Sequence, residues 1–296
     1  MKRICAISML LAAGCGLWAQ TVPVPAADAP LPPIPALLHQ VEINQQHNDE
    51  VKQNYIYTAK STVTDPHGHT KVEVVEYLFA GGVPLRRVLE RDGKPLPPED
   101  AAKEKERIDK ALAKANERKA KAGDAETDPA GYKLVTVDRL LQLSTVSNER
   151  REMLHGRSMI VFDFTGKRDA KTHSIAESLI KSIDGTAWID EQDRQLAKIT
   201  ATLPETFRVG WGLVANVSKG STVTAEMTKV RDEVWLPGAI EGQGHLRLFL
   251  VDSLIDGHLS VQAGNYRKFG STVSIEPAEN AAPPASAPAV PPAPPK

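Results

Sequence analysis

From about residue 185 to residue 269, apolar and polar residues alternate in short runs that turn residues separate. In the run 195–203, for example, every second residue is apolar: Ala197, Ile199, Ala201 and Leu203. A period of two predicts strands that bury one face and leave the other in water. The predicted strands are 185–191, 195–203, 207–217, 221–231, 234–241, 244–252 and 257–269. The short links between them require antiparallel neighbours, because parallel strands need a long crossover.

The apolar face of such a sheet needs a cover, and upstream segments supply it. Three segments have helical apolar spacing: 36–54, 137–153 and 173–183. Residues 55–79 predict a hairpin that turns at "DPHGH", and "HGRSMIVFDFTGK" predicts another strand. The sequence therefore predicts an α+β fold: one domain, residues 36–276, in which helices cover a large curved antiparallel sheet.

Three segments depart from this pattern. Residues 21–35 contain six prolines and predict an extended leader, and residues 95–123 interleave acids and bases at i,i+4 spacing. The latter predicts a charged helical insertion on the surface rather than a basic binding arm. Residues 277–296 are a Pro/Ala tail with too little apolar bulk to fold, which we expect to be disordered or polyproline-like. A spacer or docking segment is the functional alternative.

The first twenty residues have the pattern of an export signal. Lys2 and Arg3 precede the apolar run "ICAISMLLAAGCGLW", which is short for a membrane span. Cleavage after Ala19 would leave a periplasmic chain without cysteine, because both cysteines lie in the signal. Alternatively, "LAAGC" is a lipoprotein-processing box, and lipidation of Cys15 would anchor the protein to a membrane.

Composition excludes several classes of partner. The formal net charge is -1 and aromatic residues make up 5% of the chain. A near-neutral chain does not attract nucleic acid or an anionic membrane by broad electrostatics. We therefore expect no nucleic-acid partner and no transmembrane span.

No set of residues predicts catalysis, a metal site or a cofactor. His67 and His69 flank a turn glycine with no third ligand nearby, and the other histidines are isolated in sequence. Asp163 lies between two phenylalanines but on the opposite strand face, which predicts an ordinary exposed carboxylate. The glycines of "GWGL" and "GQGH" lack the strand and helix context of a phosphate loop.

The stretches "GTAWIDEQDRQLAKI", "KGSTVTAEMTKVRDEVWLPGAIEGQGHLRLFL" and "NYRKF" resemble the LolA/LolB-like superfamily of exported lipoprotein carriers. The resemblance covers roughly residues 130 to 269. It implies an incomplete β-barrel, closed by helices over an apolar cavity that holds acyl chains. The charged insertion and the Pro/Ala tail depart from the pattern of these proteins.

The residues themselves also favour a cavity. Small side chains on the covered face, such as Ala197, Ala201, Ala225 and Ala263, leave volume unless the helices press close. We expect the following residues to line that cavity: Trp188, Ile199, Ala201, Trp211, Met227, Leu246 and Leu248.

Two functional hypotheses follow. The first is an exported, non-catalytic carrier or chaperone that shields an acyl chain of a lipoprotein or lipid. The second is a cell-envelope interaction module whose core is solid, which binds envelope proteins and no ligand. An exported hydrolase is a third possibility that no catalytic group supports.

Overall fold

The computed structural model describes residues 29–80, 83–121, 135–209, 215–248 and 253–268. The described helices are α1 (Ile34–Lys52), α2 (Pro98–Lys121), α3 (Val137–Leu143) and α4 (Ile175–Ile180). The strands of the N-terminal part are β1 (Tyr55–Thr64), β2 (Thr70–Ala80), β3 (Val83–Arg91), β4 (Lys94–Pro95), β5 (Ser144–Leu154) and β6 (Arg157–Gly166). The remaining strands are β7 (Asp184–Asp190), β8 (Leu196–Thr202), β9 (Phe207–Val209), β10 (Ala215–Val217), β11 (Thr222–Val230), β12 (Val234–Leu248) and β13 (Ser253–Lys268).

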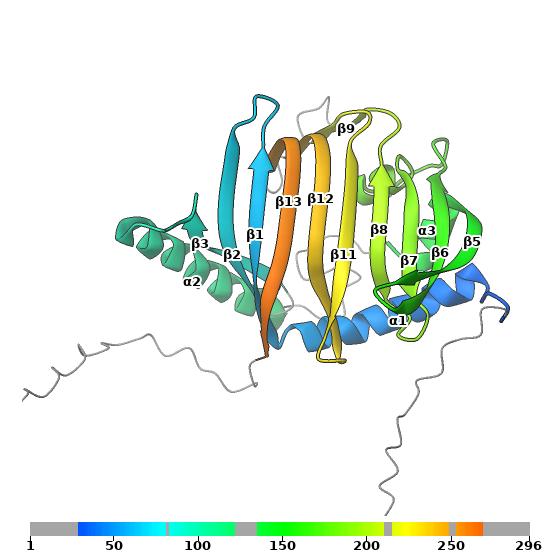
Figure 1. Ribbon diagram of the computed structural model, residues 1–296, viewed down its shortest axis with the longest axis horizontal. Coiled ribbons are helices and arrows are strands. Elements are labelled where there is room, and N and C mark those ends of the chain that lie inside the picture. Colours follow the sequence, from blue (N-terminus) through cyan, green and yellow to red (C-terminus); the bar gives the residue numbers. More distant parts are fainter. Residues whose placement is uncertain (1–28, 81–82, 122–134, 210–214, 249–252, 269–296) are drawn as a thin grey trace, which may run out of the picture.

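All these strands belong to one antiparallel sheet in the order β4-β3-β2-β1-β13-β12-β11-β8-β7-β6-β5 (Figure 1). The short β9–β10 hairpin branches from β12. The sheet's two edges, β4 and β5, do not pair with each other, so the barrel is not closed. This confirms the predicted fold class, a large open antiparallel sheet with helices.

Helix α1 crosses one face of the sheet near one end of the strands (Figure 1). Its N-terminal half is apolar, and Ile34, Leu37 and Leu38 pack against Ile160 of β6 and Ile189 of β7. Both strand residues are fully buried or nearly so. The helix begins at Ile34 with Pro35 in its first turn, so the last residues of the expected leader are helical.

The C-terminal half of α1 is held by amide side chains instead. The side chain of Asn48, which is buried, accepts from the main-chain N–H of Trp235 at 2.7 Å and donates to its carbonyl at 2.9 Å. Asn44 donates to the carbonyl of Asp193 at 2.9 Å. Near the helix end, Val51 also packs against a buried apolar cluster that contains Tyr55 and Leu236. This half of the helix is therefore tied to the sheet by hydrogen bonds and by one apolar contact at its end.

The helix predicted at 137–153 was wrong beyond its second turn. Leu143 ends α3, Ser144 has extended backbone, and β5 follows and pairs with β6. The charged run "SNERREM" has good helix formers, but pairing with β6 overrides their local preference.

The break predicted between 241 and 244 was also wrong, because β12 continues through "EGQG". Along one side, β12 pairs with β11 up to Gln243 and then with β10 from Leu246. Gly244 lies between these two partners and has a φ of +136°, a backbone conformation that favours glycine. The glycines thus mark a change of partner rather than a turn.

Residues 95–123, the expected insertion, contribute β4 and α2. Helix α2 packs on β3, a strand that the sequence did not predict, and buries Ile108. Glu104 accepts from the main-chain N–H of Val88 at 2.7 Å, and Arg107 donates to the carbonyl of Arg86. The helix therefore satisfies main-chain groups near the sheet's edge that would otherwise be open to another strand.

Candidate functional site

The strand register shows which residues share the face that α1 covers, here called the helix-covered face. In the middle of the sheet, Ala201, Val223, Gly242 and Leu259 lie opposite one another on β8, β11, β12 and β13. Two residues along each strand, on the same face, the neighbours are Ile199, Ala225, Ile240 and Val261. Every one of these side chains is apolar or absent, so the middle of this face is an apolar surface.

Helix α4 covers one end of this surface and leaves a pocket of about 310 Å³, here called the α4 pocket. Ile175 and Leu179 form its helical wall, and Val223 and Gly242 lie on its strand side. The three large side chains among them are partly exposed to water: Val223 is 42% exposed, Ile175 41% and Leu179 39%. An apolar pocket whose walls remain partly in water can gain free energy by taking up an apolar ligand.

A second pocket, of about 320 Å³, lies under the C-terminal half of α1 and is here called the α1 pocket. Tyr57, Ala59, Ile240 and Val261 contribute to it from the strands, and Lys52 from the helix. Tyr57 stacks on Tyr77 with ring centroids 5.1 Å apart. Burial raises the pKa of the Tyr57 hydroxyl well above its ordinary value, so this wall stays neutral.

The two pockets adjoin along β12 and β13. Ile240 of the α1 pocket and Gly242 of the α4 pocket are two residues apart on the same face of one strand. Together the pockets line β12 from Pro237 to Gly244, a length of about 23 Å at roughly 3.3 Å per residue. The helix-covered face thus carries one elongated apolar strip with a pocket at each end.

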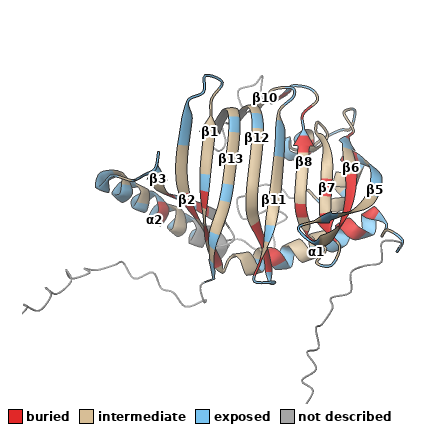
Figure 2. Ribbon diagram, in the orientation of Figure 1, coloured by how far each residue is buried: buried red, intermediate tan, exposed pale blue. Residues whose placement is uncertain are grey.

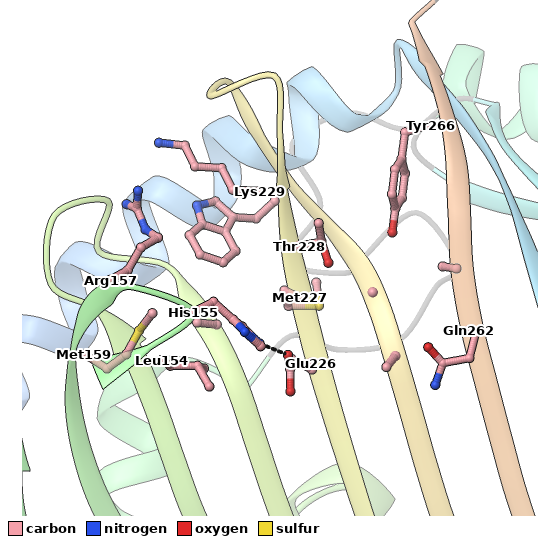
Figure 3. A pocket seen from close by; sticks show the side chains of 15 residues that line it. Leu154, His155, Arg157, Met159, Glu226, Met227, Thr228, Lys229, Gln262 and Tyr266 are labelled. Carbon is pink, nitrogen blue, oxygen red and sulfur yellow. Dashed lines mark hydrogen bonds and ion pairs between the residues drawn. The ribbon is translucent and has the colours of Figure 1, made fainter. Parts of the chain in front are cut away.

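A different hollow lies on the opposite face of the sheet and has a volume of about 550 Å³ (Figure 3). Met159, Met227 and Trp235 form an apolar floor, and His155 and Glu226 meet across it with 2.5 Å between nitrogen and oxygen. The rim also carries Arg157 and Lys229, both in ion pairs with Asp193. Its charged groups are therefore already engaged with one another.

A hollow of about 730 Å³ lies between α2 and the strands at the β4 edge, and it is larger than the three above. Ile56, Leu78, Leu96 and Leu112 give it apolar walls. It also has five charged residues among its lining: Glu76, Arg87, Glu104, Lys105 and Asp109.

The four hollows differ more clearly in the charge of their lining residues than in volume. The α4 pocket has no Asp, Glu, Lys, Arg or His among its lining residues, while the α1 pocket has Lys52 and the other two have several. A long apolar chain that fills a site removes water from any charged side chain in its walls, and this desolvation costs free energy. Such a site therefore needs uncharged walls. The α4 pocket and the strip leading to it therefore form the candidate site.

Helix α4 is short, and electrostatic contacts fix it over the pocket. Ser174 caps it by accepting from the N–H of Glu177, and the Glu177 carboxylate accepts from Arg139 of α3 at 2.9 Å and from the His173 N–H at 2.7 Å. The Arg139 hydrogen bond, followed by that from His173, lowers the pKa of Glu177 from 4.5 to about 2. The carboxylate is thus ionised at neutral pH and links α4 to α3.

The predicted cavity residues lie in several places. Ala201 lines the α4 pocket, and Ile199 is half-buried on the same face. Met227 lines both the α1 pocket and the hollow on the opposite face. Trp211 and Cys15 lie outside the described residues, and for Leu246 and Leu248 only the backbone is described.

Trp188 lies on the opposite face, where it packs near Met159 and Val161 and donates to Glu152 at 2.9 Å. A register shift follows between Trp188 and Ile189 and also turns Ala197 to that face. Strict alternation had placed Ala197 beside Ala201, and the bulge breaks this pattern.

Several residues of the pocket were not predicted. Ser221, Gly242 and Gly244 line it, but the two glycines had been interpreted as a turn between two strands. The apolar stripe of 173–183 did contain Ile175 and Leu179, which supply the helical wall.

The residues considered for chemistry have ordinary structural roles. His69 contacts Asp65 at 3.0 Å in the exposed β1–β2 turn. Asp163 accepts from Asn148 and Thr186, and these hydrogen bonds lower the pKa of its carboxyl. Within the described ranges, no three His, Cys, Asp or Glu side chains group closely enough to hold a metal ion.

No helix in the described part of the chain combines the length and hydropathy needed to cross a membrane. No protein-family model matches the chain, and no curated protein sequence does.

Solved structures do match, at low sequence identity. The chain is similar to a domain described as an outer membrane lipoprotein-sorting protein from Vibrio parahaemolyticus, with 10% identity, a TM-score of 0.37, and coverage of 80% of this chain and 94% of that one. It is similar to a LolA superfamily protein from Nitrosomonas europaea (9%, TM-score 0.32, 79% and 93%). It is also similar to a DUF1329 family protein from Desulfovibrio piger (9%, TM-score 0.38, 82% and 96%). Matches at this identity and TM-score assign neither a family to this chain nor a role to any of its residues.

Proposed function

We propose that the protein is an exported, non-catalytic carrier or chaperone that shields an acyl chain, of a lipoprotein or of a lipid, on the helix-covered face. The observation that carries the proposal is the α4 pocket, which has apolar walls, no charged lining residue and partly exposed Val223, Ile175 and Leu179. Moving a methylene group from water into such a site is favourable by about 0.8 kcal/mol, so an acyl chain binds without special polar chemistry.

Export, through the N-terminal segment, is part of the proposal. In it, cleavage before Gln20 or Thr21 releases a periplasmic protein, and processing at Cys15 anchors it to a membrane instead. The mass of the mature N-terminus distinguishes these two products.

The first experiment looks for the ligand. The mature protein is purified without denaturant and extracted for lipid mass spectrometry, and binding of the neutral fluorescent probe N-phenylnaphthylamine is measured. We expect co-purifying acyl lipid and saturable probe binding. No lipid together with no probe binding would contradict the carrier and favour an envelope interaction module.

A variant locates the site. A Cβ on Gly242 would make only ordinary contacts, the nearest at 3.7 Å from Leu259, so a side chain can begin here without strain, and Gly242→Val adds apolar bulk to the pocket. We expect probe affinity to fall more than about 10-fold, with the free energy of unfolding changed by less than about 1 kcal/mol.

Gly264→Val is the matched control. Gly264 also lies within a strand, a Cβ there would meet nothing within 4 Å, and it does not line the α4 pocket. We expect this variant to bind the probe as the wild type does. Equal binding by all three proteins would place the ligand elsewhere.

A further inference from the structure

The polar groups of the α4 pocket suggest which acyl compounds it accepts. Four of its lining residues are polar, and all four are uncharged: Thr202, Ser221, Thr222 and Gln243. A carboxylate placed in this pocket would lose its water without gaining a cation from the lining, which costs several kcal/mol. An ester or amide carbonyl loses far less, because it carries no net charge.

Ser221 has a side chain that the folded chain leaves unsatisfied. Its hydroxyl oxygen is buried and has no hydrogen-bond partner among the described residues. Its main chain is fully used, because the N–H donates to Ser218 at 3.1 Å and the carbonyl accepts from Leu203 at 2.9 Å. A buried hydroxyl without a partner costs about 1–3 kcal/mol, so its retention calls for an explanation.

The backbone opposite Ser221 makes room for this hydroxyl. A Cβ on Gly244 would come within 2.1 Å of the Ser221 oxygen, and Gly244 has a φ of +136°, which disfavours any other residue. The hydroxyl and the glycine therefore fit each other at the wall of the pocket. A serine hydroxyl has one donor to offer, and a carbonyl oxygen needs one.

We infer that the α4 pocket selects acyl groups whose head is an uncharged carbonyl, an ester or an amide, over free fatty-acid anions, and that the Ser221 hydroxyl, which is closed off from solvent in its present rotamer, turns about the Cα–Cβ bond to donate a hydrogen bond to that carbonyl. The inference rests on the proposed function and specifies its ligand class. It also explains the buried hydroxyl and the absence of charge from the pocket lining together.

Competition experiments test the selection. Decanoate, methyl decanoate and decane compete with N-phenylnaphthylamine for the full mature chain at pH 8, where decanoate is ionised. We expect the ester to compete at least about 10-fold better than the anion. Equal competition by anion and ester would overturn the selection while leaving the carrier intact. No competition by any of the three would defeat the proposed function and the inference with it.

Ser221→Ala tests the hydrogen bond. We expect affinity for methyl decanoate to fall about 3- to 10-fold and affinity for decane to stay unchanged, because only the ester has a carbonyl. Equal losses for ester and alkane would show that Ser221 only packs. The folded state is not expected to suffer, because removing an unsatisfied hydroxyl is neutral or stabilising.

Thr222→Val is the control for a hydroxyl of the same pocket. Thr222 lines the pocket but is exposed to water. We expect this variant to bind ester and alkane as the wild type does, so a loss confined to the ester in Thr222→Val would overturn the role of Ser221.

Discussion

The two halves of α1 cover two regions of the sheet that are built differently. Over β6 and β7, the helix and strands interlock through large side chains, and Leu37 and Ile160 are 1% and 0% exposed. Along the central strands, small residues leave pockets: Ala59 lies under the second half of α1, and Gly242 lies beside α4 further along the same face. Figure 2 shows the contrast, with buried residues gathered in β6 and β7 and mostly intermediate ones along β11 to β13.

This difference shows that, in one sheet, the residues that stabilise the fold can be different from those that line a binding pocket. The packed region, β6 and β7 with the first half of α1, buries the apolar area that stabilises the chain. The central region, here the pocket-lining parts of β11 to β13, retains apolar area that is partly exposed to water, as at Val223. Substitutions in the packed region should therefore change the free energy of unfolding and leave ligand affinity unchanged, and substitutions in the pockets should do the reverse.

The largest expected effect belongs to the packed region. Leu37→Ala should lower the free energy of unfolding by about 2–5 kcal/mol, because it leaves a cavity among fully buried neighbours. Probe affinity of the folded protein should not change. Urea denaturation measures the first quantity and fluorescence titration the second.

Ile43→Ala is the control on the same helix, because Ile43 is 65% exposed. It should change unfolding by no more than about 0.5 kcal/mol. If Leu37→Ala were as mild as this control, the distinction between the regions would fail.

The next effect concerns the tether of α1. Asn48→Ala leaves the N–H and carbonyl of Trp235 without their partner and should destabilise the protein by about 2 kcal/mol or more. Because Asn48 also lines the α1 pocket, probe binding should change too. Asn44→Ala, which removes one hydrogen bond, should cost only about 1 kcal/mol. Equal effects of the two variants on urea midpoints would argue against a special role for Asn48.

The smallest effect is a dependence on pH. Because the pKa of Glu177 is about 2 in the folded chain and 4.5 ordinarily, its stabilising contribution is complete above pH 4.5 and disappears as the pH falls towards 2. Wild type should be more stable than Glu177→Gln at pH 7, and the two should converge near pH 2. Thermal melts across this range measure the difference, and a gap that did not narrow on acidification would contradict the role of this carboxylate.

The parts of the fold that followed from sequence were those with strong local patterns. The β1–β2 hairpin, α4 and strands β7, β8 and β11 have clear periodicity and turn residues, and the structure has them close to the predicted bounds. The single strand predicted at 207–217 was wrong, because β9 and β10 are separate strands that pair with each other. Strand β5 could not be predicted, because its charged residues favour a helix and only pairing with β6 makes it a strand.

The pocket was harder to predict than the sheet. The alternation places Ala201 and Val223 on one face, and register confirms this. It misplaces Ala197, because a bulge is invisible in a periodic pattern. Ser221 and Gly242 carry no local signal, since their roles depend on which strands lie opposite them.

One measurement tests the central claim directly: a methyl NMR titration of the isoleucine-, leucine- and valine-labelled protein with methyl decanoate. We predict saturable shifts for Ile175, Val223 and Leu259 in the α4 pocket and none for Leu37 and Ile160 in the packed region. Saturable shifts confined to the hollow between α2 and the β4 edge or to the opposite face of the sheet, or none anywhere, would contradict an acyl site on the helix-covered face.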